Sequence, residues 1–281
     1  MKREYVQAIV TEVGGYTSHM AILARNYGIP AVLGVSDILE KTENGQRIAV
    51  DAKAGKVITN LTVDQEKQYQ VMRDEYLKKI SDMKQYLPIR PETVDGTKIE
   101  VCLNVGSAEK SELELEECTD GVGLFRTEFL YMSKKQLPTE EEQFKVYKKI
   151  AEVYGERPVV IRTLDIGGDK KLDYLELPQE DNPFLGLRAL RLCFEMKPIF
   201  KTQLRAILRA GVYGNIWIMF PMVGSIGDIR FAKQIVEEVK QELDQEEVPY
   251  DKNIKVGIMV EIPSIALMAD VAASEVDFAS I

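Results

Sequence analysis

One complete strand–helix–strand unit is predicted in residues 216–260, IWIMFPMVGSIGDIRFAKQIVEEVKQELDQEEVPYDKNIKVGIMV. Continuous apolar runs at residues 216–220 and 256–260 predict two buried strands, and residues 227–244 between them have a helical pattern. Strands that are apolar on both faces are typical of a parallel sheet covered by helices. This stretch therefore predicts an α/β fold.

The same alternation extends outward over most of the chain. Further strands are expected at residues 99–105, 122–125, 159–163 and 278–281. Further helices are expected near residues 107–116, 140–153, 186–210 and 264–273, the second of them starting with a Thr139–Glu142 capping box. Six successive strands fit either an open doubly wound sheet or most of an eight-stranded barrel. No GxGxxG motif follows the first strand, which argues against a dinucleotide-binding sheet. The chain ends inside the sixth strand, so a barrel would be incomplete.

The N-terminal part of the chain has a different pattern. A strand is expected at residues 4–10, a helix at 18–26, and short strands at 31–33 and 47–50. From Val63, apolar residues recur at spacings of three and four until Leu87-Pro88, which predicts an amphipathic helix that links two domains. The Tyr and Met residues of this helix are interpreted as packing residues and not as a cofactor site.

Composition and charge argue against several classes of protein. The net charge of −9 and the pI near 5.0 disfavour nucleic acid as a partner. No apolar run approaches the ~18 residues that span a bilayer, and no signal peptide is evident, so we expect a cytoplasmic protein without membrane insertion. Three widely spaced cysteines and a single histidine argue against a zinc site.

The single histidine, His19, follows Gly14-Gly15-Tyr16-Thr17-Ser18 at the start of the expected helix. Either Thr17 or Ser18 can cap that helix, whose unpaired amides favour an anion. Such a place suits a neutral imidazole that acts as a nucleophile and acquires a phosphoryl group. On position alone, however, the simpler interpretation is a histidine that is hydrogen-bonded at a helix start.

Three charged residues end expected strands of the barrel candidate. Arg126 and Arg162 end the second and third strands, and Glu261 ends the fifth. Active sites of α/β barrels lie at this rim. Guanidinium groups match phosphate oxygens, and a carboxylate suits a magnesium ion. A structural ion pair explains any one of these arginines, but the three residues together favour a phosphate site.

Arg188 opens the next expected helix, where it faces either the same rim or solvent. The diglycine of residues 162–170 (RTLDIGGDK) either cradles a phosphate or only turns the chain. The glutamates at 140–142 are explained by helix capping.

Several motifs in register resemble enzyme I of the bacterial sugar phosphotransferase system over essentially the whole chain. They are residues 14–25 (GGYTSHMAILAR), 121–132 (GVGLFRTEFLYM), 137–144 (LPTEEEQF), 162–170 (RTLDIGGDK), 182–188 (NPFLGLR) and 259–263 (MVEIP). The histidine motif alone is shared with pyruvate phosphate dikinase and phosphoenolpyruvate synthase. The runs at 137–144 and 162–170 are more particular to enzyme I. Tyr16 stands where the family usually has Arg.

The resemblance implies roles for individual residues. His19 is expected to take the phosphoryl group of phosphoenolpyruvate, Arg126 and Arg162 to bind its phosphate, and Glu261 to ligate Mg²⁺. Arg188 is a further candidate for the phosphate. The family passes the phosphoryl group on to the carrier protein HPr and so drives sugar uptake, and its full-length members form homodimers.

The family architecture also implies a division of this chain. Residues 1–60 are expected to be the C-terminal part of a swivelling phosphohistidine domain, 61–90 a linker helix, and 91–281 a phosphoenolpyruvate-binding (β/α) barrel of TIM type, truncated in its sixth strand. The HPr-docking subdomain, a second magnesium ligand and a catalytic cysteine are expected outside residues 1–281, so this chain alone is not expected to turn over.

Alternatives to a phosphotransferase remain at this stage. One is a binding-only remnant, another is an enzyme like pyruvate phosphate dikinase or phosphoenolpyruvate synthase, and a third is a magnesium-dependent barrel lyase. The lyase needs no phosphohistidine domain, so the GGYTSH motif argues against it.

Overall fold

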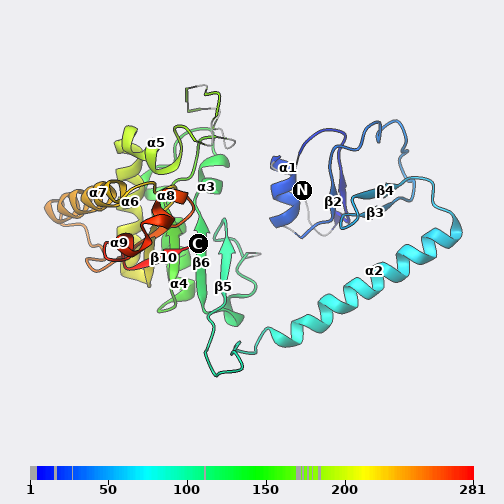
Figure 1. The fold of residues 1–281 in the computed structure, drawn as a ribbon, viewed down its shortest axis with the longest axis horizontal. Helices are drawn as coiled ribbons and strands as arrows, with labels where there is room; N and C mark the ends of the chain where they lie inside the picture. Colours follow the sequence, from blue (N-terminus) through cyan, green and yellow to red (C-terminus); the bar gives the residue numbers. More distant parts are fainter. Residues whose placement is uncertain are drawn as a thin grey trace. The chain divides into compact units, whose positions relative to one another are not determined.

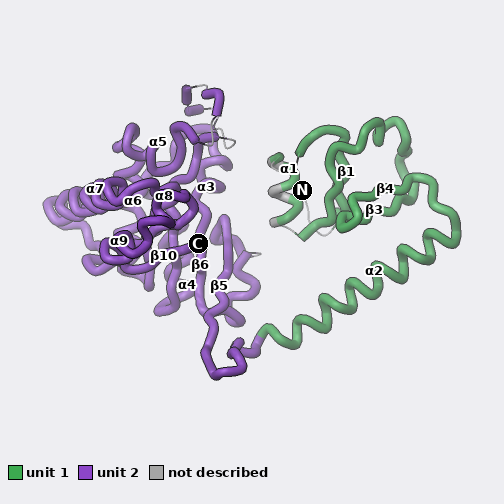
Figure 2. Tube along the Cα trace, in the orientation of Figure 1, with its two compact units in different colours: residues 1–87 green, residues 88–281 purple. Residues whose placement is uncertain are grey.

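The computed structural model describes residues 5–15, 18–26, 28–110, 112–168, 172, 174–175, 177–178, 180–182 and 185–281. The chain divides into two compact units, residues 1–87 and 88–281 (Figure 2). Each unit has its own sheet structure and is described by itself.

The larger unit is built on a parallel sheet of six strands, which confirms the six that the apolar runs predict. They are β5 (Cys102–Val105), β6 (Gly121–Arg126), β7 (Val159–Arg162), β8 (Ile216–Phe220), β9 (Lys255–Met259) and β10 (Phe278–Ser280). Each strand pairs with its neighbour in the sequence, in the order β10-β9-β8-β7-β6-β5. A doubly wound sheet reverses its strand order at a switch point, and this order does not reverse. The fold is therefore an incomplete barrel of the TIM type.

Helices connect the strands and form the outer layer of this unit (Figure 1). They are α3 (Glu128–Met132), α4 (Glu140–Tyr154), α5 (Ala189–Glu195), α6 (Lys197–Ala210), α7 (Ile226–Gln245), α8 (Pro263–Leu267) and α9 (Ala269–Ala273), with the 3₁₀ turns η3 (Glu116–Cys118) and η4 (Gly211–Tyr213). The helices expected at 140–153 and 227–244 are confirmed as α4 and α7. The single helices expected at 186–210 and 264–273 are each two: Met196, at φ −109° and ψ 54°, separates α5 from α6, and Met268 separates α8 from α9.

The prediction of a helix near residues 107–116 is wrong. The described residues of this range form turns instead. In these turns one carboxylate oxygen of Glu112 accepts the backbone amides of Gly106, at 2.6 Å, and Ser107, at 3.1 Å.

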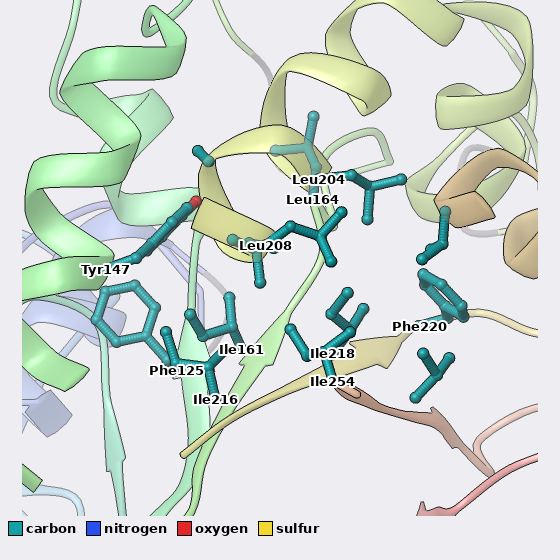
Figure 3. Packing of buried hydrophobic residues seen from close by; sticks show 14 of the residues in the cluster. Phe125, Tyr147, Ile161, Leu164, Leu204, Leu208, Ile216, Ile218, Phe220 and Ile254 are labelled. Carbon is teal, nitrogen blue, oxygen red and sulfur yellow. The ribbon is translucent and has the colours of Figure 1, made fainter. Parts of the chain in front are cut away.

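The core of the unit lies between the strands and the covering helices (Figure 3). Phe125, Ile161 and Ile218 of three adjacent strands are fully buried, and Leu204 and Leu208 of α6 pack in the same cluster. Side chains of the covering helix thus pack against these strands. Their carboxyl ends are held in fixed positions by this packing, which is what a rim of functional side chains requires.

Thr139 and Glu142 form the capping box that the sequence predicts for α4: the Thr139 hydroxyl accepts the Glu142 amide at 3.2 Å, and the Glu142 carboxylate accepts the Thr139 amide at 2.9 Å. We expect Thr139→Ala to lower the free energy of unfolding by about 1 kcal/mol, because the amide of Glu142 loses the hydroxyl that accepts it. Urea unfolding followed by the fluorescence of Trp217, the one tryptophan of the chain, reports on this unit. The control is Thr202→Ala inside α6, and an equal loss in both variants contradicts the capping role.

The smaller unit contains two short sheets. Strands β1 (Ile9–Val10) and β2 (Ala31–Val32) are parallel, and β3 (Ala49–Asp51) and β4 (Lys56–Ile58) are antiparallel. Helix α1 (His19–Asn26) lies between β1 and β2 in the sequence. The strand expected at 4–10 is thus shorter, with residue 4 outside the described residues, and β4 was not anticipated.

Helix α2 (Val63–Met83), followed by the 3₁₀ turn η2 (Lys84–Tyr86), corresponds to the amphipathic helix. It begins at a capping box between Thr62 and Gln65. No residue of α2 is buried, and Met72, Tyr76 and Met83 are exposed, so the packing role expected for its Tyr and Met residues is wrong for the described chain. No helix among the described residues combines the length and apolarity needed to cross a membrane.

Candidate active site

Arg126 and Arg162 are the last residues of the adjacent strands β6 and β7, and they are partners in the register of the two strands. Neighbouring strands lie about 4.8 Å apart, and paired residues of a parallel sheet point to the same face. The structure therefore brings the two predicted arginines side by side at the carboxyl ends of the strands. Two cations this close favour an anion between them.

Arg162 is surrounded by acidic residues in the interior of the rim. Its Nη2 lies 2.5 Å from Oε1 of Glu128, at the start of α3, and 3.3 Å from Oδ2 of Asp165. Its Nη1 lies 3.7 Å from the sulfur of Met259, the last residue of β9. The buried Nε of Arg162 and hydroxyl of Thr163 make no hydrogen bond with the residues that the structure describes. An ordered water or a bound ligand is the usual partner of buried donors of this kind.

Arg126 lies over the ring of Phe129, with its guanidinium carbon 4.9 Å from the ring centroid. Burial lowers the pKa of the Arg126 guanidinium; the Glu128 carboxylate opposes this effect, and the charge of Arg162 adds to it. The lowered pKa means that this cation lies in a partly desolvated place. An anion that binds beside Arg126 and Arg162 relieves their mutual repulsion.

Arg188 faces this cluster and not the solvent, the two possibilities that the sequence leaves open. Its side chain is buried, and its Nη2 lies 2.9 Å from Oδ1 of Asp165. Gly167 permits this approach: its φ is +113°, and a Cβ there would lie 2.6 Å from both the Leu187 carbonyl oxygen and the Arg188 Cβ. The amide of Ala189 donates to the carbonyl of Ile166 at 2.9 Å and ties the two segments together. Gly167 of the diglycine thus allows the backbone to pass close to Leu187 and Arg188.

Glu261 follows β9 on the same rim and is exposed. Its Oε1 accepts the amide of Met222 at 2.7 Å, and Met222 adopts a φ of +55°, a strained conformation for a residue with a side chain. One oxygen of Glu261 is thus fixed in place. Magnesium commonly takes only one or two carboxylates from a protein, with water and substrate phosphate completing its shell, so Glu261 suits one position. Among the described residues no group of three or more His, Cys, Asp or Glu gathers as a complete metal site.

His19 belongs to the smaller unit and is the first residue of α1. The Ser18 hydroxyl accepts the amide of Ala21 at 3.3 Å, so Ser18 caps the helix; Thr17 and Tyr16 lie outside the described residues. The backbone of Gly14, at φ +111°, adopts a conformation that favours glycine. The histidine therefore occupies the helix start that the sequence predicts.

Sequence reasoning missed Glu128 and Asp165, the two acidic residues beside the arginines. Both are buried, with 3% of each residue exposed. The signal that marks them is their spacing, two residues after Arg126 and three after Arg162. Acidic residues that close to a rim arginine are in reach of it or of its neighbour.

Comparison with known proteins places the chain among similar sequences. Residues 81–281 match the family described as PEP-utilising enzyme, PEP-binding domain, and residues 1–55 match PEP-utilising enzyme, mobile domain. The chain is 48% identical to proteins named phosphoenolpyruvate-protein phosphotransferase from Priestia megaterium and Staphylococcus aureus, and 47% identical to one from Geobacillus stearothermophilus. Each similarity covers 100% of this chain and 49% of the relative, so the chain spans about half the length of these relatives.

Proposed function

The chain belongs to the phosphoenolpyruvate-utilising enzymes, in the enzyme I family, and on that premise we propose that the protein containing it transfers the phosphoryl group of phosphoenolpyruvate to His19 and then to HPr. The observation that carries the proposal is the pairing of Arg126 with Arg162 at the ends of β6 and β7. Two guanidinium groups on one face of a rim fit the oxygens of one phosphate.

The arginines act by position and charge. Arg126 and Arg162 bind the phosphate of phosphoenolpyruvate, and Arg188, which is paired with Asp165 beside them, is a further candidate for the phosphate. Phosphoryl transfer needs little covalent work from a protein beyond a nucleophile, so orientation and charge stabilisation supply most of the catalysis.

His19 supplies the nucleophile. Its neutral imidazole attacks the phosphorus, a P–N bond forms, and the P–O bond to the enolate of pyruvate breaks with the electron pair on the departing oxygen. The amides at the start of α1 favour the negative charge that His19 then carries. A swivelling movement of the mobile domain carries phosphohistidine from the barrel towards HPr.

Glu261 is proposed as one ligand of a magnesium ion, held in orientation by the amide of Met222. A magnesium ion held there by Glu261 would supply positive charge to the phosphate and to the developing enolate. Every other ligand of the ion is assigned to substrate, water or residues beyond the described set.

The remaining parts of the proposal concern the longer protein that the relatives represent. In this proposal the full-length protein is a cytoplasmic homodimer. Its transfer of the phosphoryl group to HPr drives sugar uptake. The chain provides the histidine and the phosphate-binding arginines, and complete turnover is assigned to the longer protein.

Transfer of label tests the proposal. The protein that contains this chain is incubated with Mg²⁺ and with phosphoenolpyruvate labelled in its phosphoryl group, then digested. We expect one acid-labile phosphate on the peptide with His19, the only histidine of the 281 residues. Release of pyruvate without labelled protein supports the barrel lyase, and binding without either supports the binding-only alternative. Label on a different peptide contradicts the role of His19.

A further inference from the structure

Asp165 joins two arginines of the rim with its two carboxylate oxygens. Oδ2 lies 3.3 Å from Nη2 of Arg162, and Oδ1 lies 2.9 Å from Nη2 of Arg188. The side chains of Asp165, Arg162 and Arg188 are exposed by only 5%, 9% and 10%. A carboxylate that offers one oxygen to each of two guanidinium groups occupies the same kind of place as two oxygens of a phosphate.

The outer surface of the barrel holds a comparable arrangement. Glu140 of α4 bridges Arg205, at 2.6 Å, and Arg209, at 2.5 Å, on the neighbouring helix α6. That group is more exposed and lies on the connecting helices, where no candidate site residue is found among those described. The two bridges share their chemistry and differ in place, so Glu140 is a matched control for Asp165.

The charge balance at the rim depends on Asp165. Three arginines, Arg126, Arg162 and Arg188, stand there with the carboxylates of Glu128 and Asp165. Desolvated cations of this kind bind any phosphate strongly, including free inorganic phosphate. A carboxylate among them repels an incoming phosphate and lowers that affinity, and it pairs the arginines while no ligand is bound.

We propose that Asp165 is the internal counter-ion of the phosphate site, a residue that sets specificity. It bridges Arg162 and Arg188 and offsets part of their charge in the absence of ligand. It also weakens binding of a bare phosphate, so that a ligand needs further contacts, such as those of the phosphoenolpyruvate carboxylate, to be retained. This inference rests on the proposed function, because it takes the arginines as the phosphate site.

The test is the affinity of the chain for inorganic phosphate and for phosphoenolpyruvate, measured by titration calorimetry for the wild type, Asp165→Asn and Glu140→Gln. The asparagine keeps the shape of the side chain and removes its charge. We expect Asp165→Asn to bind inorganic phosphate on the order of tenfold more tightly, because one repulsive charge at short range is lost. We expect the affinity of Glu140→Gln to equal that of the wild type.

Stability supplies the second measurement. Without ligand, Asp165→Asn leaves arginines less well paired, so its melting temperature falls below that of the wild type. Phosphate then restores the pairing and raises the melting temperature by more than it does in the wild type. If Asp165 has only a structural role, phosphate raises the melting temperature of Asp165→Asn by less than it raises that of the wild type.

Equal or weaker phosphate binding by Asp165→Asn overturns the inference and leaves the proposed function standing if the wild type binds phosphoenolpyruvate. A wild type that binds neither ligand overturns both. If Asp165→Asn does not fold, Arg188→Gln is compared with the double variant Asp165→Asn/Arg188→Gln, which loses one charge of each sign. The double variant must bind phosphate more tightly than Arg188→Gln, and a failure to do so overturns the inference.

Discussion

Replacing Arg162 with lysine is expected to lower kcat/KM for the proposed phosphoryl transfer from phosphoenolpyruvate by about a thousandfold. Lysine keeps the charge but loses the planar fork that contacts Glu128 and Asp165 through Nη2 while presenting its other donors to a ligand. A point charge on a flexible stem neither orients the phosphate towards the nucleophile nor keeps the acidic partners in place. The measurement is the initial rate of pyruvate release by the protein that contains this chain.

The control for this variant is Arg209→Lys in α6, whose arginine pairs with Glu140 and Glu141 on the outer helices. We expect its rate to match that of the wild type. The fluorescence of Trp217 shows whether each variant is folded. If kcat/KM of Arg162→Lys falls by less than tenfold, charge alone suffices at this position, and the proposed role of the planar guanidinium group is contradicted.

Replacing Gly167 with alanine is expected to lower the free energy of unfolding by about 3 kcal/mol, from backbone strain and overpacking together. The φ of +113° is a conformation that side chains rarely adopt. The added Cβ would also meet the Leu187 carbonyl and the Arg188 side chain at 2.6 Å, and the carbonyl belongs to backbone that does not yield easily. Since Arg188 must shift, phosphate binding is expected to weaken as well.

Gly155→Ala separates the two contributions to this loss. Gly155 ends α4 with a φ of +58°, and a Cβ there meets no atom within 4 Å. Its expected cost is smaller, about 1–2 kcal/mol, from backbone strain alone, because a φ of +58° with a ψ of −115° is unfavourable for a residue with a side chain. Urea unfolding followed by Trp217 fluorescence compares the two variants, and equal losses contradict the steric role of Gly167.

The central strands of the barrel were predictable because they are continuous apolar runs, such as 216–220, that are largely buried. The choice between barrel and open sheet was not, because strand order is a property of tertiary pairing. Likewise the spacing of residues 107–116 satisfies a helix, whereas the folded chain forms turns there in which Glu112 binds the backbone of Gly106 and Ser107.

The candidate site shows the same division. Arg126 and Arg162 could be placed at the rim from sequence, because the end of a strand fixes where its last residue lies. That Arg188 turns towards them could not, because it depends on Gly167 and Asp165, which meet Arg188 only after the chain has folded. Position along a strand is a local property, whereas the pairing of charges is not.

The sequential strand order of the barrel has a consequence for the way the chain folds. Each strand from β6 to β10 pairs with the strand that immediately precedes it in the sequence. No strand has to wait for a partner made much later, so the entropy lost in closing each loop is limited to one crossover. The sheet can therefore grow during synthesis, one strand and one helix at a time from β5 onward. Arg126 and Arg162, the arginines of β6 and β7 that we propose bind phosphate, are then among the first parts of the rim to be assembled.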